Sequence, residues 1–183
     1  MPTYLFQSWQ NFYALTGEAA ATLVGLLFVA LSFGESVISG ETQTAKLFRI
    51  WVEPTLFDFV QVLGISVLAE MPQLPSLAFA GLFFAHTCIR LLRWWEILGH
   101  FRGPEAPTDL ERADWVEQVV LPGLGYAVGL VSAVGLGLGQ AWGPLWVAIY
   151  VLLMLLLGIN NTWNQFAWMA GEKIKRRSVK RRR

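Results

Sequence analysis

Apolar and polar positions alternate along this chain in long blocks rather than with a short period. Five blocks hold about 20 or more mostly apolar residues, which is the length that a helix needs to cross a bilayer. The pattern therefore predicts an all-α, polytopic integral membrane helix bundle with five transmembrane helices. The predicted spans are residues 12–33, 50–69, 76–98, 115–139 and 144–168.

The segments between the predicted spans differ in length. Residues 70–75 and 140–143 are short, so we expect the second and third spans, and the fourth and fifth, to form antiparallel hairpins. A chain of 183 residues is one domain by length. We therefore expect one transmembrane bundle, residues 1–170, followed by a basic tail, residues 171–183.

Every Lys and Arg falls in a segment that a single topology places on the same side of the membrane. An excess of these residues in short loops marks the cytoplasmic face. Five spans with a cytoplasmic C-terminus put the N-terminus outside and leave the outer face without bases; four spans would lose this consistency. The 14 bases are Lys46, Arg49, Arg90, Arg93, Arg102, Arg112, and the eight tail residues Lys173, Lys175, Arg176, Arg177, Lys180, Arg181, Arg182 and Arg183.

Composition supports a membrane protein and argues against several kinds of functional site. The chain is 55% hydrophobic, with a mean hydropathy of +0.47. Its only cysteine, Cys88, excludes an internal disulfide and a cysteine-based zinc site. The sequence has no HExxH, Walker A, nucleophile-elbow or haem-attachment motif, so we expect no cofactor, no metal and no catalytic residues. Because no basic segment precedes the first apolar block, we expect that block to stay in the mature protein.

Polar residues inside the spans gather at similar depths on the cytoplasmic side. Asp58 lies eight residues after Ile50, and Arg90 lies eight residues before Leu98, so both lie about 12 Å from the inner boundary. We therefore expect Asp58 and Arg90 to pair, and Gln61 and His86 match in depth one turn deeper. Ionisable residues within spans are costly and are functional candidates. The candidate polar pocket comprises Glu53, Asp58, Gln61, His86, Arg90, Arg93, Glu96, Asn160, Asn161 and Asn164.

Several of these residues have a simpler explanation. Glu53 and Pro54 together suit the first turn of a helix. Arg90 and Arg93 have stems long enough to reach the headgroups. The asparagines can join neighbouring helices through hydrogen bonds. A structural pairing of Asp58 with Arg90 is the leading interpretation of that pair, and a path for a substrate or ion is the alternative.

Small residues recur at four-residue spacing in two of the spans. Such residues let helices approach closely in lipid, either within one bundle or between copies in a homo-oligomer. Glu18 lies beside the first set, in the outer half of its span, where no base is available to neutralise it. It can reach toward water, bind a cation or hydrogen-bond a neighbouring helix. The small residues are Gly17, Ala21 and Gly25 in the first span, and Gly125, Gly129, Ala133 and Gly137 in the fourth.

The segment from Glu18 to Ser32 resembles the first span of small uncharacterised bacterial multi-span inner-membrane proteins. These proteins open with a similar Ala-Thr-Leu-x-Gly-Leu-x-Phe-Val-Ala run, here at residues 21–30. The resemblance covers about fifteen residues and implies a bacterial inner-membrane location. It carries no function with it.

The expected partners are the lipid bilayer and, at the basic tail, anionic lipids, which attract such a segment by about 1 kcal/mol per base. Nucleic-acid binding is not needed to explain the tail. We expect a small channel- or transporter-like assembly with the polar pocket as its site. The alternatives are a non-transporting structural or regulatory subunit of a larger membrane complex and, third, a membrane enzyme. A transport path predicts water beside Asp58 and His86, whereas a structural role predicts dry, paired side chains.

Overall fold

The computed structural model describes residues 6–38, 42–72, 74–102 and 115–181, and the side chains of most of them. This part of the chain is helical and contains no strand. A short 3-10 turn, η2, precedes the first long helix, and a π-helical turn, η3, precedes α5. The elements are η2 (Gln7–Trp9), α1 (Gln10–Ile38), α2 (Thr42–Glu70), α3 (Ser76–Arg102), η3 (Val116–Val120), α5 (Leu121–Gly137) and α6 (Gly143–Arg181).

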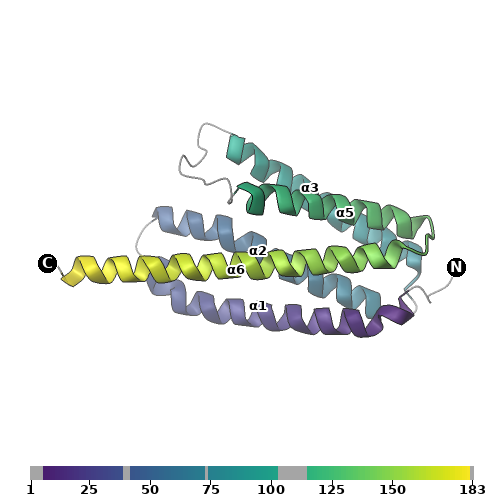
Figure 1. The fold of residues 1–183 in the computed structure, drawn as a ribbon, viewed down its shortest axis with the longest axis horizontal. Helices are drawn as coiled ribbons and strands as arrows, with labels where there is room; N and C mark the ends of the chain where they lie inside the picture. Colours follow the sequence, from purple (N-terminus) through teal and green to yellow (C-terminus); the bar gives the residue numbers. More distant parts are fainter. Residues whose placement is uncertain (1–5, 39–41, 73, 103–114, 182–183) are drawn as a thin grey trace.

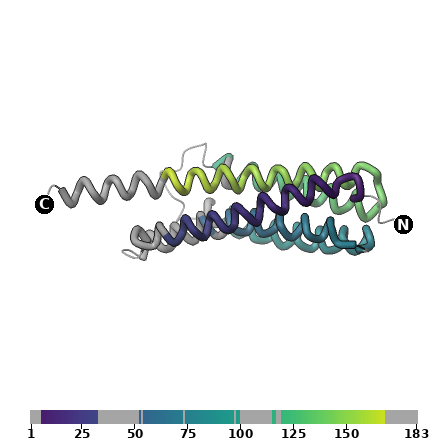
Figure 2. Tube along the Cα trace, turned by 90° about the horizontal axis from the view of Figure 1, so that it is seen from below, coloured from purple at the N-terminus to yellow at the C-terminus, as the bar shows by residue number. Residues whose placement is uncertain are grey.

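The five long helices lie side by side along one axis (Figure 1). Helix α1 packs on α2 and α6, α2 also packs on α6, and α5 packs on both α6 and α3. Figure 2 shows α1 close to the start of α6 at its N-terminal end and diverging from it further along. At that close end the Tyr13 hydroxyl donates to the carbonyl oxygen of Pro144, with 3.3 Å between the two oxygens.

Among the described residues, three helical segments are long and apolar enough to cross a membrane: Gln7–Ser32, Ser76–Glu96 and Gly143–Ala167. Helix α5 is apolar but shorter, and α2 carries more polar residues. Large apolar side chains cover much of the outer surface; Leu77, Leu92 and Trp163 are 68–72% exposed. Such a surface suits hydrocarbon rather than water. These features are compatible with a membrane location.

Helix α2 turns its polar side chains inward. Thr55, Asp58, Gln61 and Ser66 are all buried, whereas Val60 on the same helix is exposed. This is the reverse of the pattern in a water-soluble protein and is compatible with lipid around the helix, because lipid tails offer no hydrogen-bonding groups. The polar residues of α2 must therefore find their partners within the bundle.

The tight hairpin expected between the fourth and fifth predicted spans is present as the turn from α5 to α6. Gln140 N–H bonds to the Gly135 carbonyl, and Gly139 N–H bonds to the Leu136 carbonyl, both at 2.9 Å. This pair of bonds is a Schellman motif, which ends a helix with a residue in the left-handed region. Gly139 occupies that position with φ +67°.

The hairpin expected between the second and third spans differs from the arrangement found. Helices α2 and α3 follow one another, but their backbones approach each other at only a few points, and α3 packs mainly on α5. Gly129 of α5 permits this close approach, since a Cβ there would lie 3.0 Å from Thr87 Cγ2 of α3. Bulky side chains such as Phe83 fill the wider gap toward the rest of the bundle.

The π-helical turn η3 is joined to α3 by a side-chain hydrogen bond. Trp94 Nε1–H donates to the Val119 carbonyl oxygen at 2.9 Å. Pro122, near the start of α5, has no N–H and interrupts the backbone ladder there. Gly123 leaves room for the indole ring, because a Cβ at this position would lie 2.8 Å from Trp94 Cζ2.

Only some of the small residues serve packing within the chain. Gly17 faces Ser66 of α2, where an added Cβ would lie 3.0 Å from Ser66 Cβ, whereas Ala21 and Gly25 are exposed. Of the two interpretations of these residues, packing within the bundle therefore applies to Gly17 and not to Ala21 and Gly25. Both residues lie away from the buried face of α1, which contains Tyr13, Ala20 and Leu27.

Helix α5 shows the same division. Gly125, Gly129 and Ala133 are buried against neighbouring helices. Gly137 is exposed, and a Cβ on it would meet nothing within 4 Å. The residues at four-residue spacing thus lie on the packed face of α5 for two turns, and the last of them lies off that face at the C-terminal end of the helix.

Candidate functional site

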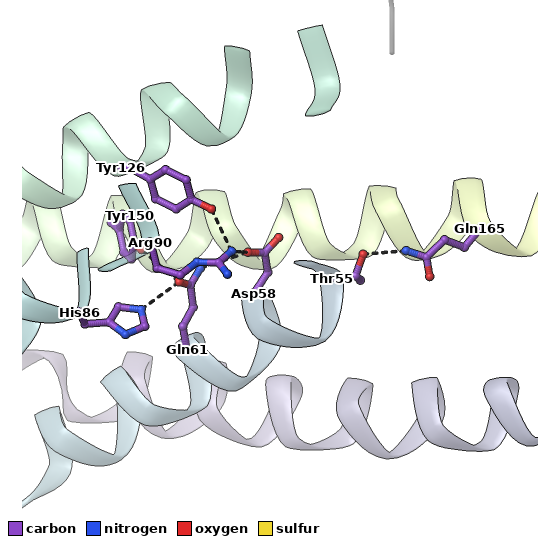
Figure 3. Close-up of polar contacts among 8 residues, drawn as sticks. All are labelled: Thr55, Asp58, Gln61, His86, Arg90, Tyr126, Tyr150 and Gln165. Carbon is purple, nitrogen blue, oxygen red and sulfur yellow. Dashed lines mark hydrogen bonds and ion pairs between the residues drawn. The ribbon is translucent and has the colours of Figure 1, made fainter. Parts of the chain in front are cut away.

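An ion pair between α2 and α3 lies at the centre of the candidate site. Arg90 Nη2 donates to Asp58 Oδ1 at 2.6 Å and to the Tyr126 hydroxyl at 2.9 Å (Figure 3). The two charged side chains are only 13% and 6% exposed. The pairing predicted from equal depth is confirmed. Arg90 does not extend toward the headgroups but turns into the bundle.

The guanidinium of Arg90 has aromatic as well as ionic contacts. Its central carbon lies 5.9 Å from the ring centroid of Phe57 and 5.5 Å from that of Tyr126. Both distances fall within the range of cation–π attraction, which is strongest away from water. The buried Nε of Arg90 has no hydrogen-bond partner among the described residues. The Nη2 atom of Arg90 therefore has two hydrogen-bond partners, whereas its Nε–H has none among the described residues.

Gln61 connects this ion pair to a second set of side chains. Its Nε2 donates to Asp58 Oδ1 at 3.4 Å, and its Oε1 accepts from the Tyr150 hydroxyl at 3.3 Å. A carboxylate only accepts hydrogen bonds, so the amide nitrogen must face Asp58 and the amide oxygen must face away. His86 Nε2 lies 3.0 Å from that oxygen and is therefore the protonated ring nitrogen.

The depth match predicted for Gln61 and His86 is thus confirmed by their contact. Together the six side chains form one continuous hydrogen-bonded group, here called the polar network. It draws on four helices: α2, α3, α5 and α6. Its members are Asp58, Gln61, His86, Arg90, Tyr126 and Tyr150.

A separate polar contact lies one turn of α2 away from Asp58. Gln165 Nε2 of α6 donates to Thr55 Oγ1 at 2.7 Å (Figure 3). On the same helix Asn161 is buried, and Asn160 and Asn164 are half-buried. This end of α6 therefore turns amide side chains toward the bundle, as the sequence predicted.

Two of the expected pocket residues on α3 are not part of the polar network. Arg93 and Glu96 are exposed on α3, because the inward face of that helix follows Phe83, Thr87 and Leu98. The side chain of Glu53 lies outside the described residues. Pro54 lies inside α2, which begins at Thr42, so the Glu53–Pro54 pair does not start the helix. The side chains of residues 33–50, 101–114 and 168–183, which include the other bases, also lie outside the described part.

Sequence reasoning missed both tyrosines of the polar network and Thr55. A tyrosine hydroxyl within an apolar span needs a hydrogen-bond partner, just as a carboxylate does. That signal singles out Tyr126 and Tyr150, since each lies in the interior of a predicted span. The hydroxyl of Thr55 was a weaker signal, because threonine can satisfy itself on its own helix.

Glu18 stands apart from the polar network. Its side chain is exposed on α1, and its backbone carbonyl accepts a 2.9 Å hydrogen bond from the Thr22 hydroxyl. Within the described residues, no group of three or more His, Cys, Asp and Glu side chains is arranged to hold a metal ion.

The chemistry available at the site is electrostatic. The polar network holds one carboxylate and one guanidinium, so its fixed charges balance, and neutral donors and acceptors surround them. No family model matches this chain, and neither a curated protein nor a solved structure matches it. The function must therefore be argued from the site alone.

Proposed function

We propose that the chain is a five-span membrane protein that works as a small transport-type assembly in the bacterial inner membrane. Helix α2 has 29 residues and is about 43 Å long, and residues 116–137 of η3 and α5 extend about 33 Å. Both exceed the roughly 30 Å hydrocarbon core. The inward polar face of α2 lets it cross lipid despite its lower hydropathy.

The one-sided distribution of Lys and Arg supports the orientation. With five spans the N-terminus lies outside and the C-terminus is cytoplasmic. Asp58 and Arg90 then lie in the cytoplasmic half of the bundle. The basic end of α6 lies at the inner surface, where anionic headgroups attract it.

The observation that carries the transport proposal is where the polar network lies. Helices α1, α2 and α6 pack on one another, and α5 packs on α6 as extensively as on α3. Helix α3 packs mainly on α5 and approaches α2 at only a few points. The Asp58–Arg90 pair links α3 to α2 across that wider separation. We call this contact between α2 and α3 the joint.

A charged joint of this kind can respond to an ion. Removing one partner of a buried pair leaves an expensive lone charge, whereas replacing it with another ion of the same sign does not. A cation on Asp58 together with an anion or water on Arg90 would release α3 from α2, because neither charge is then left without a partner. Rocking of one helix group against another around a central site is a common transport mechanism.

A second candidate is a non-transporting structural or regulatory subunit of a larger membrane complex. The specific observation in its favour is that Asp58 is buried and accepts hydrogen bonds from both Arg90 and Gln61. In that case the pair only fixes the packing of α3. The two candidates differ in whether the pair ever opens.

Flux through proteoliposomes separates the two candidates. The purified protein would be screened with protons, alkali cations and small anions. If it transports, Asp58→Asn should change the flux while Arg93→Gln should not, because Arg93 is exposed and outside the polar network. Both variants should keep the oligomeric state of the native protein. Absence of flux for every ion, together with native co-purification of a larger complex, would establish the subunit candidate instead.

A further inference from the structure

The carboxylate of Asp58 uses only one of its two oxygens in the polar network. Arg90 Nη2 at 2.6 Å and Gln61 Nε2 at 3.4 Å both donate to Oδ1. No hydrogen bond reaches Oδ2 from the described residues, and Figure 3 shows this oxygen pointing away from Arg90. Asp58 is nevertheless only 4% exposed. A buried carboxylate oxygen without a donor is costly, so Oδ2 is where this site can take up a further positive charge.

Asp58 is the only carboxylate of the polar network. Helix α1, which also packs on α2, has no ionisable residue at positions 19–34, the stretch that faces this level of α2. The ionisable groups around Asp58 therefore come from the other three helices. They are Arg90 and His86 of α3, Tyr126 of α5 and Tyr150 of α6.

A proton suits this site better than a metal ion or an anion does. A metal cation needs several ligands, and within the described residues no group of three or more His, Cys, Asp and Glu side chains is arranged to supply them. The amide oxygen of Gln61 faces away from Asp58, toward Tyr150 and His86. An anion would be repelled by the carboxylate. A proton needs only one lone pair of one oxygen, which Oδ2 provides.

Polar side chains continue from Asp58 toward one end of the bundle, between α2 and α6. Thr55, one turn of α2 away, accepts a hydrogen bond from Gln165 Nε2 of α6 at 2.7 Å. Asn161 is buried on α6, four residues before Gln165. Because α2 and α6 run in opposite directions (Figure 1), Asn161 lies nearly level with Asp58. Thr55, Asn161 and Gln165 are called the polar seam, and they lie toward the end of the bundle that holds the C-terminus.

Apolar side chains fill the interior toward the opposite end, where α5 turns into α6. Val62, Phe79 and Val147 there are at most 2% exposed. The hydroxyls of Thr16 and Ser66 lie 3.2 Å apart and are hydrogen-bonded to each other. A proton moves along hydrogen-bonding groups or water, and hydrocarbon side chains offer neither. The arrangement therefore favours proton exchange through the polar seam.

We propose that the polar network is a proton-binding site, in which Asp58 Oδ2 takes up a proton that arrives along the polar seam. The inference rests on the proposed transport function, because it names the ion to which the joint responds. The proton leaves water and forms an O–H bond at Oδ2, so Asp58 becomes neutral and nothing is oxidised or reduced. Arg90 then loses its counter-ion and needs water in its place, which weakens the link between α2 and α3. Release of the proton restores the ion pair.

Infrared difference spectroscopy of the full-length protein in lipid tests the binding step. A protonated buried carboxyl absorbs at a higher C=O frequency than one in water. As the pH is lowered, this band should appear in the native protein and in Glu96→Gln, which changes an exposed carboxylate of α3. It should be absent from Asp58→Asn, and also from Asp58→Asn combined with Arg90→Met, which leaves no lone buried charge and guards against misfolding. The band in either Asp58 variant, or its absence from the native protein, would overturn the proposal.

Two matched variants test the route of the proton. Thr55→Val removes a hydroxyl from the polar seam, and Thr16→Val makes the same change toward the opposite end of the bundle. After a sudden drop in pH the Asp58 band should grow more slowly in Thr55→Val and at the native rate in Thr16→Val. An unchanged rate in Thr55→Val, or slower growth in Thr16→Val, would overturn the route along the polar seam.

Proton flux in proteoliposomes separates this inference from the transport function on which it rests. A pH gradient should drive protons inward, reported by an enclosed pH-sensitive dye, with the native protein and Glu96→Gln but not with Asp58→Asn. If the protein moves an alkali cation or a small anion but no proton, the proton inference is overturned and the transport function stands. If it moves no ion although the Asp58 band is present, the transport function is overturned and the proton-binding step stands.

Discussion

Arg90 reaches from α3 to Asp58 of α2 across 2.6 Å, although the two helices hardly approach each other along their backbones. The link is made by long side chains and not by close helix packing. It also includes Tyr126 of α5, which accepts a second hydrogen bond from the same nitrogen of Arg90. One guanidinium thus joins three helices, and changes at this point should affect the whole bundle.

Removing one member of the ion pair should destabilise the protein more than removing both. Asp58→Leu leaves the Arg90 cation buried without a counter-ion, a change that lowers the free energy of unfolding by about 3–5 kcal/mol in proteins. Asp58→Leu combined with Arg90→Met removes both charges at similar volume and should recover much of that loss. Unfolding in detergent measures both. Strictly additive effects of the single changes would show that the two residues do not interact.

Tyr126→Phe should lower the free energy of unfolding by about 1.5–3 kcal/mol, the usual contribution of a hydrogen bond to a charged group. The ring remains, so its cation–π contact with Arg90 is kept and only the hydroxyl is lost. The same change in the Arg90→Met background should have a smaller effect. Detergent unfolding of the four proteins provides this comparison. An equal loss in both backgrounds would mean that the hydroxyl acts elsewhere.

Gly129→Ala should separate α3 from α5. The new Cβ would lie 2.9 Å from Tyr150 Cε2 and 3.0 Å from Thr87 Cγ2, so two helices must move to admit it. Overpacking of this kind typically lowers stability by about 1–3 kcal/mol. Gly137→Ala on the same helix is the control, since its Cβ would meet nothing within 4 Å. In thermal unfolding in detergent, Gly137→Ala should be as stable as the native protein. Equal losses of stability in the two variants would contradict the packing described.

The two ends of the chain should label from opposite sides of the membrane. Single tags at Thr3 and at Arg183 would be probed with an impermeant reagent, first in intact cells and then after permeabilisation. Five spans predict that the first tag is accessible from outside and the second only from the cytoplasm. If both tags were accessible from the same side, the number of spans would be even.

The sequence by itself determined that the chain is helical and at which level along the helices its polar groups meet. Five long apolar blocks predicted a helical membrane protein, and in the described part the chain is helical, with three helices long and apolar enough to span. Depth along a helix follows from counting residues, because each adds a fixed rise. For this reason the pairing of Asp58 with Arg90 and the matching depth of Gln61 and His86 could be predicted from the sequence alone.

Only the tertiary structure decided which way each side chain faces. Rotation of a helix about its axis depends on its neighbours, and in lipid apolar residues occur on both the inner and outer faces. Depth therefore grouped Arg93 with Arg90, yet one is exposed and the other is paired. For the same reason the sequence could not tell that α3 packs on α5, that Tyr126 and Tyr150 complete the polar network, or that Glu18 faces outward. These outcomes depend on how the side chains of different helices pack against one another, and counting residues along one helix does not reveal that packing.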